Sequence, residues 1–222
     1  MIENATGNCI PDPCKTLSQQ LSNPSYKAKI EELRTKVGEK KESGYKQNKS
    51  GVYEALKQPV NGHTAIFDID ANTRGYMHTH LDDYEEGIDP KSGNPRLIKP
   101  IKIFSPQDVL KFLELVRRTK SNGIPIHLVY GTLVTGKRSY VLTFTGDVNF
   151  PIDQLKEARD YDIPYKRAVD KRSKSGLEKA FLVFLRDHIK VNGINLYRFK
   201  DNGTLQKKSL NNAGDLITDE CQ

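Results

Sequence analysis

The hydrophobic pattern changes between helical and strand spacing several times along the chain. The first helical stretch covers residues 26–37, with Ser25 as the expected N-cap and Gly38 as the stop. Apolar residues recur in this stretch at helical intervals, at Ala28, Ile30, Leu33 and Val37. Residues 1–24 contain prolines and a glycine and show little periodicity, so we expect an N-terminal linker or extension there.

Short segments rich in strand-forming residues predict a sheet. Before residue 81 they are 44–49, 51–57, 65–69 and 75–80, of which the first two form a hairpin. Later in the chain they are 101–104, 125–135, 138–145, 194–199 and 204–208. Helical spacing returns from Ser105 to about Lys120, near residues 152–159 and over residues 175–189. This order predicts one α/β domain over residues 25–222, with a mixed β-sheet, flanking helices, and a C-terminal helix plus strand pair.

Residues 81–100 form a long polar stretch without helical or strand spacing. Its first half is acidic, and its second half is rich in Pro, Gly and Asn. A loop of this length within a compact domain is usually functional or mobile. We therefore expect residues 81–100 to be an inserted loop beside the functional site.

Composition narrows the class of protein. The chain has 222 residues, 36% of them hydrophobic, which is enough for one domain with a core. No apolar run approaches the roughly 18 residues of a membrane span, so we expect no membrane partner. The net charge of +7 permits anionic partners. However, the densest basic run, residues 166–174, has no interleaved aromatic residues, which argues against nucleic-acid binding.

Three cysteines lie near the ends of the chain, at Cys9, Cys14 and Cys221. Their spacing does not supply the paired ligands of a zinc finger. Two interpretations stay open. Either Cys9 and Cys14 form a small disulfide in an oxidising compartment, or all three residues are free thiols.

The clearest candidate for chemistry is the sequence Gly-Tyr-Met-His-Thr-His at residues 75–80. His78 and His80 alternate along a predicted strand, so both rings leave the same face. Two imidazoles are two of the three protein ligands that a catalytic zinc requires, with the fourth position left for water. A His-x-His pair by itself is more often structural than metal-binding. The choice between these two interpretations therefore depends on the other residues of the site.

Asp108, Ser105 and Glu42 are the candidates for the remaining roles. Ser105, Pro106 and Asp108 form a near-ideal helix start. A helix that begins directly after a strand places its first turn at the sheet edge, where active sites of open α/β sheets collect. We expect Asp108 to be the third metal ligand and Ser105 to reach the substrate carbonyl. Glu42, close to a predicted strand, is the expected general base.

Together these residues resemble the JAMM motif of the JAB/MPN metallopeptidases, in which a Glu precedes His-x-His and then Ser-x-x-Asp. The resemblance covers residues 26–145, and the C-terminal part is similar to tails of bacterial JAMM-like domains, some of them at the ends of long exported chains. It implies a JAB/MPN-type, cytidine-deaminase-like architecture. It also implies Zn²⁺ bound by His78, His80 and Asp108, and hydrolysis of peptide or isopeptide bonds.

The chain departs from the family pattern at two points. Leu81 stands where the family usually has Pro, and residues 81–104 separate His80 from Ser105, where the family spacing is short. Three acidic residues of the inserted loop therefore stay open as competing metal ligands: Asp82, Asp83 and Asp89.

In the mechanism that the resemblance implies, Glu42 takes a proton from water activated on zinc and passes it to the leaving amine. Ser105 hydrogen-bonds the tetrahedral oxyanion. The acidic loop acts as a flap over an extended peptide or protein substrate and favours a basic segment. The cellular location is open between secretion, as part of a larger exported bacterial protein, and the cytoplasm.

Four alternatives stay open. The chain could be a catalytically inactive MPN-like protein-binding module, or a secreted bacterial toxin or effector domain. An amidohydrolase barrel would require a longer chain and additional metal-binding histidines, whereas this chain has five histidines in total. A nucleic-acid-binding protein is suggested only by the isoelectric point of about 9.2.

Overall fold

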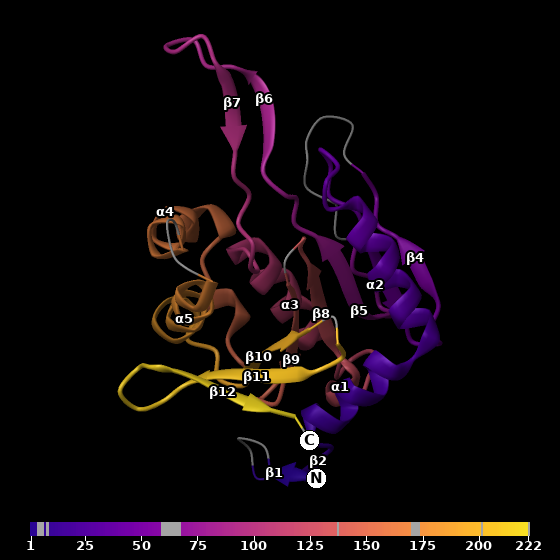
Figure 1. Cartoon of the computed structure of the whole chain (residues 1–222). Helices are drawn as coiled ribbons and strands as arrows, with labels where there is room; N and C mark the ends of the chain where they lie inside the picture. The colour runs from indigo at the N-terminus through magenta and orange to yellow at the C-terminus, as the bar shows by residue number, and fades with distance from the viewer. Residues whose placement is uncertain are drawn as a thin grey trace.

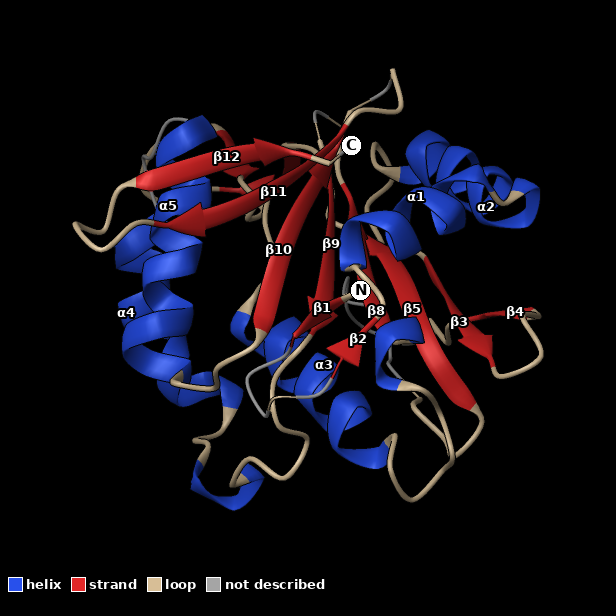
Figure 2. Ribbon diagram, turned by 90° about the horizontal axis from the view of Figure 1, so that it is seen from below, coloured by secondary structure: helices blue, strands red, loops and turns tan. Residues whose placement is uncertain are grey.

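A mixed β-sheet forms the centre of the molecule, with helices on both of its faces (Figures 1 and 2). The computed structural model describes residues 1–3, 7, 9–58, 68–136, 138–169, 174–200 and 202–221. The strand order within this part of the chain is β12-β11-β10-β9-β8-β5-β3-β4. Strands β5 and β8 pair in parallel, and the other neighbours are antiparallel.

The strands of this sheet are β3 (Gly44–Asn48), β4 (Tyr53–Ala55), β5 (Thr73–Thr79), β8 (Tyr130–Val134), β9 (Ser139–Phe144), β10 (Ile194–Phe199), β11 (Leu205–Leu210) and β12 (Leu216–Glu220). Two small antiparallel pairs lie outside it. One consists of β1 (Ile2–Glu3) and β2 (Cys9–Ile10), and the other of β6 (Tyr84–Ile88) and β7 (Pro95–Ile98). The β6–β7 hairpin projects from the body of the molecule (Figure 1).

Two helical layers cover the sheet. Helices α1 (Pro13–Ser22) and α2 (Pro24–Lys36) pack on one face. Helices α3 (Pro106–Arg118), α4 (Ala158–Val169) and α5 (Lys174–Phe184) pack on the other, and α5 continues as a π-helix over Leu185–Ile189. Short 3₁₀ turns occupy Ile126–Leu128 and Ile152–Gln154. Within the described ranges, no helix is long and apolar enough to cross a membrane.

The predicted mixed α/β layout is confirmed, and the differences are local. The region expected to be a linker contains α1, which starts because the Asp12 carboxylate accepts the Cys14 amide at 2.9 Å. Helix α2 is capped by Asn23 rather than Ser25, since the Asn23 side chain accepts from the Tyr26 amide and Pro24 occupies the first turn.

Further along the chain, residues 101–104 are not a strand, although Ile103 and Phe104 are fully buried. The expected loop 81–100 contains the β6–β7 hairpin. Instead of the helix expected near residues 152–159, the structure has the 3₁₀ turn Ile152–Gln154, and helix α4, which contains Pro164, begins only at Ala158. Strand β12 adds a third member to the C-terminal strand pair. Most of the strand predicted over residues 65–69 lies outside the described residues.

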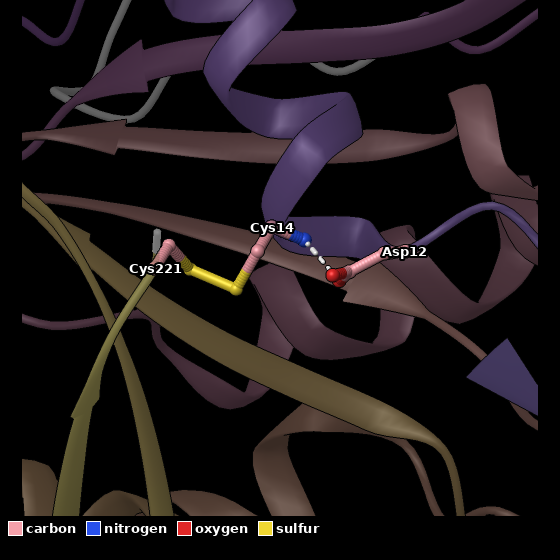
Figure 3. The surroundings of a disulfide bond; sticks show 3 residues. All are labelled: Asp12, Cys14 and Cys221. Carbon is pink, nitrogen blue, oxygen red and sulfur yellow. Dashed lines mark hydrogen bonds between the residues drawn. A yellow bond between two sulfur atoms is a disulfide. The ribbon is translucent and has the colours of Figure 1, made fainter. Parts of the chain in front are cut away.

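A disulfide joins the two ends of the chain. Cys14, in the first turn of α1, is bonded to Cys221, directly after β12, whereas Cys9 is a free, exposed thiol (Figure 3). The prediction of a Cys9–Cys14 bridge, and that of three free thiols, are therefore both wrong. The bridge spans a sequence separation of 207 residues. A loop of this size strongly restricts the unfolded chain.

Replacement of both bridged cysteines, Cys14→Ser with Cys221→Ser, should lower the free energy of unfolding by about 5 kcal/mol, because the unfolded chain regains its loop entropy. Denaturant unfolding monitored by circular dichroism measures this change. The matched control is Cys9→Ser, which should leave the stability unchanged. An equal effect of the control and the double variant would contradict the assignment of the bridge.

Candidate metal centre

Three side chains converge at the end of β5 and the start of α3. His78 lies in β5, and His80 is the first residue after the end of this strand. Strand alternation points both imidazole rings to the same face. Asp108 lies in the first turn of α3. One potential ligand atom from each residue lies within 4.8 Å of the other two. In the described part of the chain, this is the group of His, Cys, Asp and Glu side chains that could hold a metal ion.

The Asp108 carboxylate faces both imidazoles. Its Oδ1 lies 3.2 Å from His78 Nε2, and its Oδ2 lies 3.2 Å from His80 Nε2. All three side chains are almost completely buried, with exposed fractions of 4% for Asp108, 0% for His78 and 7% for His80. The two Nε2 atoms and the carboxylate therefore form one compact donor set in the interior.

The start of α3 explains where Asp108 lies. Ser105 Oγ accepts from the Asp108 amide at 3.2 Å, and Asp108 Oδ2 accepts from the Ser105 amide at 2.6 Å. This reciprocal capping box begins the helix and fixes the carboxylate rotamer at the same time. The helix start predicted from the sequence is confirmed, and it places Ser105 beside the three candidate ligands.

Burial and neighbouring charges shift the pKa values of Asp108 and His80 in opposite directions. Burial raises the pKa of Asp108, but the His78 and His80 rings beside it outweigh this and hold that pKa well below its usual value. Burial lowers the pKa of His80, but the Asp108 and Glu42 carboxylates, with a backbone contact to Ile101, raise it to about 9. The Asp108 carboxylate and the two imidazoles therefore stabilise one another electrostatically.

A backbone carbonyl orients the second imidazole. His80 Nδ1 lies 2.7 Å from the Ile101 carbonyl oxygen, which can only accept a hydrogen bond. Nδ1 is thus the donor of this bond, and Nε2 faces Asp108. Contacts of this kind fix the tautomer and ring orientation of metal-binding histidines.

Glu42 approaches the same cluster from the connection between α2 and β3. Its Oε1 lies 3.9 Å from His80 Nε2, and its side chain is 13% exposed, more than any of the three buried residues. A Cβ on Gly44 would lie 2.6 Å from the Met77 carbonyl oxygen, so only glycine allows this close approach to β5. Gly44 thereby permits the backbone path that carries Glu42 to the site.

The three competing acids of residues 81–100 are engaged elsewhere. Asp83 pairs with Lys102 at 3.1 Å, and the Asp82 carboxylate lies against Gly136. Asp89 accepts the amides of residues 91 and 92 in the turn between β6 and β7. The structure thus brings together Glu42 and the three residues expected as ligands, with Ser105 beside them.

Sequence reasoning missed two contacts that support the centre. One is the Ile101 carbonyl, which carries no sequence signal. The other is Tyr76, whose hydroxyl donates to the Asp108 carbonyl at 2.9 Å. Tyr76 lies two residues before His78 on the same face of β5, so strand alternation could have placed it beside the histidines.

The projecting hairpin begins and ends beside the site. Its first leg begins four residues after His80, and Lys102, after its second leg, donates to the Leu81 carbonyl and pairs with Asp83. Burial and then Glu86 raise the pKa of Tyr84, at the start of β6, and Glu42 contributes to the same shift. Lys102 therefore holds the end of the hairpin against the segment that follows His80.

We found no matching protein-family model, and no similar protein among curated sequences or solved structures. The interpretation of the site consequently depends on its own geometry.

Asp108→Ala should abolish stoichiometric binding of a divalent metal, because the variant loses the only anionic member of the three-residue donor set. Elemental analysis after dialysis against zinc should give about one ion per chain for the wild type and almost none for the variant. Asp83→Ala is the matched control and should keep its metal. Full metal content in Asp108→Ala would move the ligand role to another residue.

Proposed function

We propose that the protein is a zinc-dependent hydrolase of peptide or isopeptide bonds, with a JAB/MPN-type architecture. The observation that carries the proposal is the position of Glu42. This carboxylate comes from a distant part of the sequence, yet its Oε1 lies 3.9 Å from His80 Nε2 without being part of the compact donor set of His78, His80 and Asp108. A separate carboxylate next to a three-residue metal site is the arrangement expected of a hydrolase with a general base.

The donor set fits zinc. Two imidazole nitrogens and one carboxylate are ligands that Zn²⁺ accepts, and three protein ligands are typical of catalytic zinc sites. Bound there, zinc would act as a Lewis acid and would lower the pKa of water toward neutral pH. The Ile101 carbonyl orients His80, and the Ser105 amide orients Asp108. Metal sites commonly use such hydrogen bonds to hold their ligands in place.

Two residues of the chain then carry out proton transfer and charge stabilisation. Glu42 accepts a proton from the attacking water and later returns it to the departing amine, which its partial exposure permits. The Ser105 hydroxyl accepts from the Asp108 amide, so its own proton is available to a substrate oxygen. A hydrogen bond to the oxyanion of the tetrahedral intermediate contributes about 3 kcal/mol in comparable sites.

The β6–β7 hairpin is the proposed flap over an extended substrate segment. It projects from the body of the molecule (Figure 1) and carries two exposed apolar side chains, Ile88 and Leu97. Its acidic residues favour a basic segment of the substrate. This assignment makes peptides and proteins, rather than small amides, the proposed substrate class.

We also propose that the protein acts in an oxidising compartment, as a secreted protein or part of an exported chain. The Cys14–Cys221 disulfide supports this, because disulfides persist in such compartments and are rare in the cytosol. An exported hydrolase of this kind is compatible with a toxin or effector role.

One observation favours a second candidate function, that of a catalytically inactive MPN-like protein-binding module. The His78, His80 and Asp108 side chains are so deeply buried that a bound ion could serve stability alone. The two candidates differ in the role of Glu42, because a structural site needs no general base.

Glu42→Gln should reduce hydrolysis by at least about 100-fold while zinc remains bound, since the amide cannot accept the proton. Mass spectrometry of a peptide library incubated with the zinc-loaded protein measures cleavage, and elemental analysis measures the metal. The control is Glu39→Gln, an exposed residue in the same connection. Unchanged cleavage in Glu42→Gln would refute the proposed base, and metal binding without cleavage by the wild type would favour the binding module.

A further inference from the structure

One peptide bond links helix α4 to the metal centre. The Phe104 carbonyl accepts a hydrogen bond from the Tyr165 hydroxyl, and the Ser105 amide donates to Asp108 Oδ2 at 2.6 Å. The carbonyl and the amide belong to the same peptide group. Because this group is planar, fixing the direction of its carbonyl also fixes the direction of its N–H.

Tyr165 is well suited to hold that carbonyl. It lies in α4, far along the chain from the histidines, and its side chain is fully buried. Its ring centroid lies 4.6 Å from that of Phe184 in α5, which restricts its movement. Burial raises the pKa of Tyr165 well above its usual value, so the hydroxyl keeps the proton that it donates.

We propose that Tyr165 is a positioning residue of the metal centre, which acts on Asp108 through the peptide bond between Phe104 and Ser105. Its hydrogen bond orients the Ser105 N–H toward the carboxylate. It also polarises that N–H, because hydrogen bonds in a chain strengthen one another in a low-dielectric interior. The inference depends on the metal site of the proposed function, but not on peptide hydrolysis.

Two further contacts explain why a small displacement of Phe104 would be felt at the site. The Phe104 ring centroid lies 6.4 Å from that of His78 and 6.1 Å from that of Phe181 in α5. In addition, Tyr76 of β5 donates to the Asp108 carbonyl. The first turn of α3 is therefore held between a tyrosine from β5 and a tyrosine from α4.

This arrangement makes the C-terminal helices part of the metal centre. The residues that resemble the metallopeptidase motif all lie before residue 109, and α4 begins at Ala158. If Tyr165 positions Asp108 as proposed, the affinity of the site for metal depends on a helix that contributes no ligand. Hydrogen-bond partners of this kind commonly change metal affinity by 10- to 100-fold.

The test compares Tyr165→Phe with Tyr161→Phe. Tyr161 lies one turn earlier in α4, is also buried, and has its ring centroid 5.7 Å from that of Phe184. Its hydroxyl, however, accepts from the Lys156 amide and not from the segment that contains Phe104 and Ser105. Each variant loses one buried hydroxyl from the same helix, so their difference isolates the contact with Phe104.

The probes are Zn²⁺, with affinity measured by competition against a chromophoric chelator, and Co²⁺, with its visible absorption spectrum recorded at saturation. Tyr165→Phe should bind Zn²⁺ about tenfold more weakly and shift the Co²⁺ spectrum, because the carboxylate is held less firmly. Tyr161→Phe should match the wild type in both measurements. Thermal unfolding of both variants without metal shows whether removal of either hydroxyl lowers the stability of the protein by a similar amount.

Three results would overturn the proposal. They are wild-type affinity and spectrum in Tyr165→Phe, equal weakening in both variants, and no divalent metal bound by the wild type. The last result would remove the metal centre as a whole. A wild type that binds zinc but cleaves no peptide would refute the hydrolase assignment alone and leave the role of Tyr165 intact.

Discussion

The Asp108 carboxylate is the interaction on which the arrangement of the site depends. A buried carboxylate is costly unless charges and hydrogen bonds compensate it. His78 and His80 lie against its two oxygens, and the Ser105 amide donates to one of them. The same amide belongs to the cap of α3, so the cap also holds the carboxylate in the position where it meets His78 and His80. Helix capping and the clustering of the candidate ligands are thus one constraint.

The topology of the sheet brings the other participants to this point. Strands β5 and β8 are parallel, and α3 is the helix in the connection between them. The end of β5 and the start of α3 therefore meet at one edge of the sheet, where ligand sites of α/β proteins collect. Strand β3 runs antiparallel to β5, so the connection that carries Glu42 ends at the same edge, where β3 begins. The β6–β7 hairpin is inserted there without breaking this geometry, since Lys102 ties its two legs together.

Several errors of the sequence analysis share a physical cause. Residues 101–104 have a strand-like composition, but Ile103 and Phe104 are buried by contacts with helices and not by strand pairing. Helix α4 contains Pro164, which lacks an amide donor and obscures the helical pattern. Helix α1 is short and has Pro11 before it and Pro13 as its first residue, although Asp12 gives it a regular cap. In each case the tertiary packing of the segment decides a structure that its local pattern leaves ambiguous.

The sequence by itself determined the features that are encoded within a few residues. The alternation of His78 and His80 and the capping box of Ser105 and Asp108 follow from local backbone geometry, and both appear as expected. Only the tertiary structure decided the contacts between distant segments, namely the approach of Glu42, the Tyr165 contact with Phe104 and the Cys14–Cys221 bridge. Such contacts depend on how the helices and the sheet pack together, and the spacing of neighbouring residues carries no record of that packing.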